Sequence, residues 1–226
     1  MSVLKIVIGN KRYSSWSLRG WLAVKLSGLD YEEIKLPLDT PEFYERIKNY
    51  TPTSCVPVLH HGDAVVWDSL AIIDYIDRFC PALKLWPDDM TAFAHAKAIS
   101  CEMHSGFAAL RNAATMNIGT TYKGLKLSDA VAKDVARIDA IWSETRAKFG
   151  TEGDFLFGDI SAADIMFAPV IFRFETYDLP RSDCAAAYIT SMLNHPAMQS
   201  WIADALSETT LINVYEFDPT SRVLGE

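Results

Sequence analysis

Three short segments in the first eighty residues carry groups that could bind an anion or a peptide. The first is Tyr13-Ser14-Ser15-Trp16-Ser17, which lies between a predicted strand and a predicted helix. The free N–H groups and the positive dipole end of a helix start favour a bound anion, and serine hydroxyls can donate to it. Serine is also a preferred helix cap. Taken alone, this segment is therefore better explained by capping than by catalysis.

The second segment is Ser54-Cys55-Val56-Pro57, just before another predicted strand. Bonds that precede proline can be cis, and a cis Pro57 would turn the backbone N–H and C=O of Val56 toward a peptide-like ligand. A trans proline at the first residue of a strand is the commoner arrangement. Pro57 alone therefore decides little.

The third segment is Trp67-Asp68-Ser69, at a junction of strand and helix. Asp68 can pair with an ammonium group, while the Ser69 hydroxyl and the N–H groups of the helix start can hold a carboxylate. Together they would bind the α-amino-acid end of a ligand. Alone, Asp-Ser at a helix start again indicates capping, so the interpretation depends on whether the three segments converge.

The elements that must position these segments alternate between strand and helix. The apolar patterns predict strands over residues 4–8, 31–36, 57–60 and 64–67, and helices that begin at Ser17, Thr40 and Ser69. In this order all three segments lie where strand ends face helix starts, which is the place where open α/β sheets bind ligands. The three segments are therefore expected to form one site.

The rest of the chain has helical periodicity only. Residues 81–91 are rich in Pro and Asp, as linkers are, and helices are predicted over residues 91–117, 128–149, 161–177, 182–193 and 196–206. We therefore predict an α/β domain over residues 1–80, a linker over 81–91 and an all-helical domain over 92–226.

Composition excludes several classes of protein. The 226 residues carry 21 Lys and Arg against 29 Asp and Glu, so the net charge of −8 disfavours a nucleic-acid partner. The sequence has no export signal and no long uninterrupted apolar stretch, so we expect a cytoplasmic protein with no membrane partner. The four cysteines are too widely spaced for a redox pair or a zinc knuckle, so no metal is predicted.

The order of elements and three motifs resemble the cytosolic glutathione S-transferase family over nearly the whole chain. The motifs are Val56-Pro57, Asp68-Ser69-Leu70-Ala71-Ile72 and Gly158-Asp159-Ile160-Ser161-Ala162-Ala163-Asp164. The last resembles the family's capping motif, and Ser161 with Asp164 can form a reciprocal capping box that supports folding. The resemblance implies a thioredoxin-like glutathione-binding domain followed by an all-α domain.

The resemblance also implies roles for the serine loop, which is similar to that of serine-type members, particularly the zeta class and related bacterial enzymes. Ser14 would hold the glutathione sulfur as a thiolate, with Ser15 as the next candidate. Tyrosine-type members use a tyrosine near this point, so Tyr13 is a rival. The loop contains no cysteine, so disulfide exchange through a protein thiol is disfavoured.

One departure from the family pattern affects glutathione binding. Many relatives have Gly followed by Lys or Gln before the Val-Pro pair, whereas this chain has Ser54 and Cys55. A contact to glutathione is therefore lost, unless Lys11, Arg12 or His60 compensates. Cys55 itself is more readily explained as a small, partly buried thiol than as a reactive one.

The pocket for the electrophile is expected on the linker side of the helical domain. Met103, Phe107 and Arg111 share one stripe of a predicted long helix. Met and aromatic residues at helical spacing are more often core than pocket. A guanidinium on this stripe could bind an anionic substrate or form a surface salt bridge. His104 has no evident metal-ligand partner and is interpreted as structural.

These inferences predict a glutathione transferase in which Asp68 and Ser69 bind the γ-glutamyl end and the Val56 backbone, beside Pro57, binds the cysteinyl part. Glutathione is the co-substrate, a small electrophile is the second substrate, and the chain is expected to form a homodimer. Two alternatives stay open. One is a zeta-like cis–trans isomerase of the maleylacetoacetate type, and the other is a member that binds ligands or proteins without turnover.

Overall fold

The structure, a computed structural model, describes residues 3–150, 152–216 and 223–225. Its first domain is built around β1 (Leu4–Ile8), whose side chains are buried except that of Lys5. The other elements follow in the predicted order: α1 (Ser15–Leu26), β2 (Tyr31–Lys35), α2 (Pro41–Arg46), the 3₁₀ turn η1 (Ile47–Asn49), β3 (Val58–His61), β4 (Ala64–Trp67) and α3 (Ser69–Phe79).

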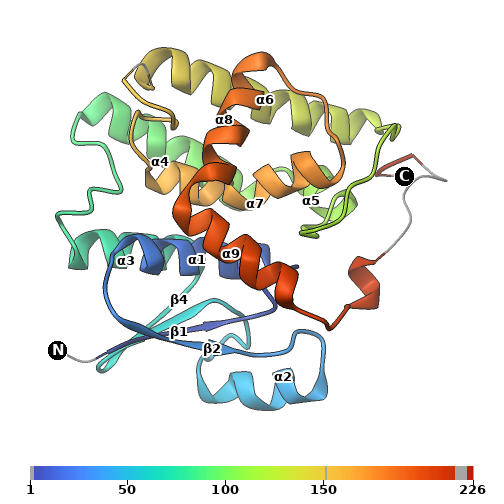
Figure 1. The fold of residues 1–226 in the computed structure, drawn as a ribbon. Coiled ribbons are helices and arrows are strands. Elements are labelled where there is room, and N and C mark those ends of the chain that lie inside the picture. Colours follow the sequence, from blue (N-terminus) through green and yellow to red (C-terminus); the bar gives the residue numbers. More distant parts are fainter. Residues whose placement is uncertain (1–2, 151, 217–222, 226) are drawn as a thin grey trace.

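The strands form one mixed sheet in the order β2-β1-β3-β4. β1 pairs in parallel with β2, and β3 is antiparallel to both β1 and β4. Helices α1 and α3 cover one face of the sheet, and α2 lies below the other (Figure 1). Alternation along β1 explains this arrangement, because Ile6 and Ile8 pack toward α1 and α3 while Val7 packs against Phe43 of α2.

The second domain contains only helices and 3₁₀ turns among its described residues, apart from isolated bridges. It comprises α4 (Met90–Ser105), α5 (Ala108–Ala113), α6 (Asp129–Phe149), α7 (Ala162–Thr176), α8 (Asp183–Asn194), α9 (Pro196–Ser207) and η2 (Asn213–Tyr215). Almost every residue of α7 is buried, so α7 is the central helix of the domain. Within the described ranges, no helix is both long and apolar enough to span a lipid bilayer.

The predicted helix over residues 91–117 is wrong at its centre, because it is two helices. α4 ends at Ser105 with Gly106 as its C-cap, and Phe107 takes the left-handed conformation with φ of 57° before α5 begins. A Cβ at Gly106 would lie 2.6 Å from the Glu102 carbonyl oxygen, so a larger residue would not fit there. The break turns the Phe107 side chain into the core, where only 7% of its surface is exposed.

The capping motif forms as predicted and is extended by a tertiary contact. The buried Asp164 carboxylate accepts hydrogen bonds from Ser161 N at 2.8 Å and Ser161 Oγ at 2.6 Å. It also accepts from Leu156 N at 3.1 Å and Tyr188 Oη at 2.8 Å. Burial raises the pKa of Asp164, and these hydrogen bonds oppose that rise. The motif therefore joins the start of α7 to α8.

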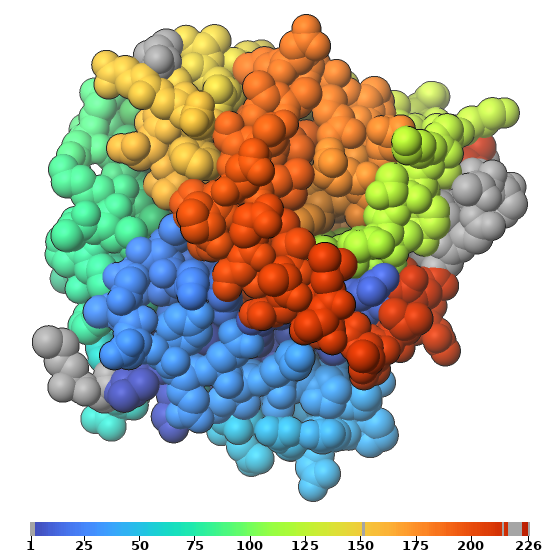
Figure 2. All heavy atoms as spheres, in the orientation of Figure 1, coloured from blue at the N-terminus to red at the C-terminus, as the bar shows by residue number. Residues whose placement is uncertain are grey.

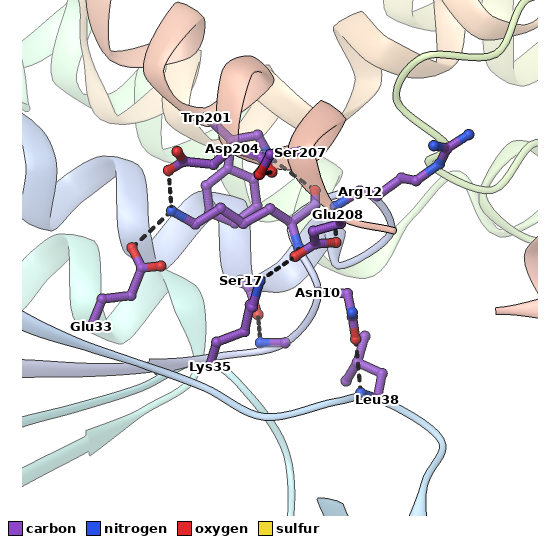
Figure 3. A network of polar contacts seen from close by, with 12 residues as sticks. Asn10, Arg12, Ser17, Glu33, Lys35, Leu38, Trp201, Asp204, Ser207 and Glu208 are labelled. Carbon is purple, nitrogen blue, oxygen red and sulfur yellow. Dashed lines mark hydrogen bonds and ion pairs between the residues drawn. The ribbon is translucent and has the colours of Figure 1, made fainter. Parts of the chain in front are cut away.

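A polar network around Lys11 joins the two domains next to the serine loop (Figure 3). The buried Lys11 ammonium lies 2.8 Å from Glu33 of β2 and 2.6 Å from Asp204 of α9. Trp201 donates to the Lys11 carbonyl, and Glu208 accepts from the Lys11 N–H. Figure 2 shows α9 lying across the first domain at this place. The network fixes the chain immediately before the serine loop.

Candidate functional site

Two adjoining pockets lie between the domains and share Trp16, Cys55 and Val56. The Asp68 pocket has a volume of about 450 Å³ and is lined by Trp16, Thr53, Cys55, Val56, Pro57, Trp67, Asp68, Ser69 and His104. The Ser14 pocket, of about 500 Å³, is lined by Tyr13, Ser14, Ser15, Trp16, Leu38, Phe43, Tyr44, Ser54, Cys55, Val56, Arg111, Asn112, Thr115, Met116, Arg173 and Tyr215. The three chemistry-bearing segments therefore meet in one cleft.

The Val56–Pro57 peptide bond is cis. Its position depends on α1, because a Cβ on Gly20 would lie only 2.8 Å from Pro57 Cγ. Glycine at position 20 thus allows the proline ring to pack directly on the helix. Val56 lines both pockets and therefore lies where the two adjoin.

Asp68 and Ser69 differ in whether their side-chain oxygens already have hydrogen-bond partners. Asp68 has a φ of 76°, and its Oδ1 caps α3 by accepting from Leu70 N at 2.8 Å and Ala71 N at 3.3 Å. Its Oδ2 lies 3.2 Å from His104 Nε2 of α4. Ser69 is 1% exposed, and its hydroxyl has no hydrogen-bond partner in the described part of the chain. A buried hydroxyl without a partner is uncommon, and this one belongs to a residue that lines the Asp68 pocket.

The Ser14 hydroxyl acts as a helix cap and also lines a pocket. Ser14 Oγ accepts from Ser17 N at 3.4 Å and donates to Ser17 Oγ at 2.7 Å. Ser17 Oγ is buried and accepts from Gly9 N at 2.9 Å. Because a hydroxyl carries one donor and two acceptor sites, Ser17 can donate to Ser14 once the Ser14 proton points to a ligand. Ser15 lines the same pocket from the first turn of α1.

The rival Tyr13 is engaged elsewhere. Its hydroxyl donates to Glu216 Oε1 at 2.6 Å, and its ring stacks on Tyr215 at 5.4 Å between ring centroids. Burial, followed by the contact with Glu216, raises the pKa of Tyr13 to about 12. A phenol that already donates to a carboxylate is poorly placed to donate to a sulfur, so the geometry favours Ser14 over Tyr13.

Three arginines at the Ser14 pocket form no ion pair with a carboxylate among the described residues: Arg111 and Arg173 line the pocket, and Arg19 lies behind Trp16. Arg19 donates to the Met166 carbonyl, and Arg173 donates to the carbonyls of Ala114 and Arg111. Burial, followed by the charge of Arg111, lowers the pKa of Arg19 to about 9 and that of Arg173 to about 10. A bound anion would reduce this mutual repulsion, so the cleft is electrostatically suited to one.

Trp16 connects the arginines to both pockets. The Arg19 and Arg111 guanidinium carbons lie 4.5 Å and 4.8 Å from its ring centroid, within the range of cation–π contact. The His104 ring meets it edge-on at 5.3 Å. Arg111 also donates to the carbonyls of His104 and Gly106, which satisfies acceptors at the C-terminal end of α4. Arg111 is therefore not isolated in solvent, and it forms no surface salt bridge within the part of the chain that the structure describes.

Several expectations about the surroundings of the cleft differ from the structure. Met103 and Phe107 belong to the buried core and line neither pocket; Met116 is the methionine in the Ser14 pocket. Lys11 pairs with two carboxylates, and His60 contacts the Tyr50 carbonyl. Along with Arg12, they line neither pocket.

Other residues reach the cleft although the sequence pattern assigned them no role there. His104 lines the Asp68 pocket, and Arg173 and Tyr215 line the Ser14 pocket. Arg173 carried a detectable signal, because it is a charged residue inside an almost wholly apolar helix. His104 and Tyr215 carried none. Across the described ranges, no group of three or more His, Cys, Asp or Glu is arranged to hold a metal ion.

Comparison with known proteins identifies relatives over both domains. Residues 13–78 match the glutathione S-transferase N-terminal domain, and residues 126–204 match the glutathione S-transferase C-terminal domain. Glutathione S-transferase Z1 of Arabidopsis thaliana is 30% identical over 84% of this chain and 90% of its own length. A probable maleylacetoacetate isomerase of Caenorhabditis elegans is 28% identical over 80% of this chain and 85% of its own length.

Solved structures share the fold at lower sequence identity. A diazinon-metabolizing glutathione S-transferase of the silkworm Bombyx mori superposes with a TM-score of 0.71 and 19% identity, covering 90% of this chain and 97% of that one. A glutathione transferase homologue from Burkholderia, solved with bound glutathione, gives a TM-score of 0.70 and 20% identity over 91% of this chain and all of that one. The predicted two-domain architecture is therefore confirmed.

Proposed function

Because the chain belongs to the glutathione S-transferase family, we propose that its cleft binds glutathione and activates the thiol for addition to small electrophiles. The γ-glutamyl end would occupy the Asp68 pocket, with its ammonium on Asp68 and its carboxylate on Ser69 and the start of α3. The cysteinyl part would pair with the Val56 backbone. The sulfur would then reach Ser14 in the neighbouring pocket.

The observation that carries this proposal is the buried hydroxyl of Ser69, which has no partner among the residues that the structure describes. It lies beside Asp68 in a pocket that continues along Val56 to Ser14. A carboxylate bound at the N-terminal end of α3 would accept from Ser69 and interact favourably with the helix dipole. A ligand with one α-amino-acid end and a peptide body fits this sequence of contacts.

The available interactions are strong enough to ionise the thiol. A free thiol with a pKa of about 8.5 is about 3% ionised at pH 7, and lowering that pKa by about two units requires roughly 2.7 kcal/mol. A hydrogen bond to a charged group supplies about 1.5–3 kcal/mol, and a helix N-terminus about 0.3–1 kcal/mol more. Ser14 and the start of α1 can therefore supply the required stabilisation.

Titration calorimetry with glutathione tests the binding arrangement. Ser69→Ala should weaken binding about tenfold, the effect of one lost hydrogen bond to a carboxylate. The substitution removes no hydrogen bond of the free protein among its described residues, so its thermal stability should stay that of the wild type. S-methylglutathione, which keeps the γ-glutamyl end, should show the same loss. Unchanged affinity in Ser69→Ala would contradict the placement.

The arginine cluster favours a second candidate activity, the isomerisation of an unsaturated dicarboxylate by addition and elimination of the thiolate. Arg111 and Arg173 line the Ser14 pocket, next to the proposed sulfur position, and neither pairs with a carboxylate in the described ranges. Maleylacetone is the direct test substrate. Arg111→Gln should reduce its turnover more than that of an uncharged aryl halide, whereas Arg46→Gln on the exposed face of α2 should affect neither. No reaction with maleylacetone would remove this candidate.

We also propose that the chain is a cytoplasmic homodimer in which β4 and α3 face the partner subunit. Val65 and Phe79 are large, exposed apolar residues on these elements. They flank the β4 edge of the sheet from its two faces, since Phe79 contacts His61 at 4.4 Å between ring centroids, while Val65 pairs with His60, which contacts the Tyr50 carbonyl on the other face. Val65→Glu with Phe79→Glu should shift the sedimenting mass to that of a monomer. Leu211→Glu, also at an exposed apolar residue, is the matched control.

A further inference from the structure

We propose that Cys55 is a modification site, at which glutathione disulfide forms a mixed disulfide with the protein. The inference rests on the proposed function, because it uses the same subsite for the γ-glutamyl group. It adds to that function a covalent reaction in which a side chain of the cleft takes part.

The position of Cys55 distinguishes it from the other thiols. Its side chain is exposed and lines both the Asp68 pocket and the Ser14 pocket. Its Sγ donates to the Thr53 carbonyl at 3.4 Å, a weak contact that an incoming disulfide can replace. Cys80, Cys101 and Cys184 line neither pocket. Cys55 is thus the cysteine that a ligand crossing from one pocket to the other would meet.

The buried hydroxyl of Ser69 is an independent sign that this pocket recognises a ligand. Ser69 Oγ has no partner among the described residues, and it lies with Asp68 at the far end of the pocket that Cys55 lines. One arm of glutathione disulfide would bind there by its γ-glutamyl end. The disulfide would then lie near the junction of the two pockets, and holding the reacting sulfurs together raises the rate of exchange.

The exchange needs no further oxidant. The Cys55 thiol loses its proton to solvent, and the thiolate attacks the sulfur of the bound glutathione arm. A bond forms between Cys55 Sγ and that sulfur, while the bond between the two glutathione sulfurs breaks. The second glutathione leaves as a thiolate. The Cys55 sulfur is oxidised, the leaving sulfur is reduced, and an excess of reduced glutathione reverses the reaction.

The modification would block the cleft. A glutathionyl group attached to Cys55, with its γ-glutamyl end on Asp68 and Ser69, occupies the subsite of the co-substrate. Turnover should therefore fall in proportion to the modified fraction and return when a reductant removes the group. The ratio of glutathione disulfide to reduced glutathione would set the active fraction.

Intact-protein mass spectrometry tests the proposal on the full chain at pH 8. Glutathione disulfide should add one glutathionyl group to the wild type and to Cys101→Ser. Over the same incubation time, Cys55→Ser should gain none. Cys101 is the matched control because its side chain is also exposed. Peptide mapping should place the group on Cys55. Equal modification of Cys101, or an unmodified Cys55, would overturn the proposal.

A second comparison separates recognition from simple exposure. Ser69→Ala should slow the modification by glutathione disulfide about tenfold, and it should leave the rate with hydroxyethyl disulfide, which has no γ-glutamyl group, unchanged. Equal rates of wild type and Ser69→Ala with glutathione disulfide would also overturn the proposal. Calorimetry of the wild type with reduced glutathione distinguishes the two failures, since binding without a Cys55 adduct leaves the proposed function intact.

Discussion

Replacing Ser14 with alanine should raise the pKa of the bound glutathione thiol by about one to two units. The hydroxyl would be the donor to the sulfur, and a hydrogen bond to a charged group contributes about 1.5–3 kcal/mol, where one pKa unit corresponds to about 1.4 kcal/mol. Because the thiolate is the reactive form, activity rises with pH through this pKa. The variant should therefore need a higher pH for the same ionised fraction.

The expected size of the effect depends on pH. Well below both pKa values, kcat/KM for an aryl halide should fall about tenfold to a hundredfold in Ser14→Ala. The difference should narrow as pH rises and nearly vanish once both thiols are ionised. The thiolate absorbance of the binary complex, followed against pH, reports the same shift without turnover.

Controls must separate this chemistry from folding. Ser14 caps α1 through Ser17 N, so its loss should also cost about 1 kcal/mol of folding stability, well within the stability of a typical domain. Ser15→Ala is the matched control, because Ser15 lines the same pocket and is not the cap. An unchanged pH profile in Ser14→Ala, or an equal shift in Ser15→Ala, would refute the assignment. Tyr13→Phe would then be the next variant to measure.

Three further predictions concern stability. Asp164→Ala should lower the free energy of unfolding by about 3–5 kcal/mol, because it leaves several buried donors unsatisfied. Tyr188→Phe removes only one of these donors and should lower the free energy of unfolding by about 1–2 kcal/mol. Denaturant titration measures both values. Lys11→Met should lower the free energy of unfolding by about 2 kcal/mol, and Lys35→Met, at a half-exposed lysine, by less than about 1 kcal/mol. Equal losses of stability in the two variants would argue against the buried network around Lys11. The pKa of Tyr13 is raised in the folded state, so its stabilising effect is complete below the ordinary tyrosine value of 10.0 and is lost as pH rises toward about 12. Wild type should therefore lose more stability than Tyr13→Phe over this interval, and parallel curves would contradict the raised pKa.

Much of the N-terminal domain could be predicted because local signals there agree with the tertiary structure. Short apolar runs, turn residues and caps identified the order of strands and helices. The rule that ligands bind where strand ends face helix starts then brought Ser14, Val56 and Asp68 together. The Ser161 and Asp164 cap was also readable, since both partners lie within one helical turn.

The errors arose where distant contacts decide the structure. The apolar stripe continues through Phe107, so periodicity gave no sign of the break that Gly106 introduces between α4 and α5. That break turned Phe107 into the core. The contact of His104 with Asp68 joins elements 36 positions apart in the sequence, and no local pattern predicts such a pair.

The same limit applies to the electrostatics of the cleft. Helices α1, α5 and α7 each contribute one arginine to the cluster of Arg19, Arg111 and Arg173, and the sequence singled out Arg111 alone. The engagement of Tyr13 by Glu216 likewise depends on the path of the C-terminal segment. These contacts change the interpretation of the serine loop, since they occupy its rival phenol and place positive charge beside its hydroxyl.

A crystal structure of the protein with glutathione bound tests the central proposal most directly. We predict that the γ-glutamyl carboxylate accepts from Ser69 Oγ, the cysteinyl backbone pairs with Val56 and the sulfur lies within hydrogen-bond distance of Ser14 Oγ. A cleft that stays empty at saturating glutathione, or a sulfur placed on Tyr13 and away from Ser14, would contradict it.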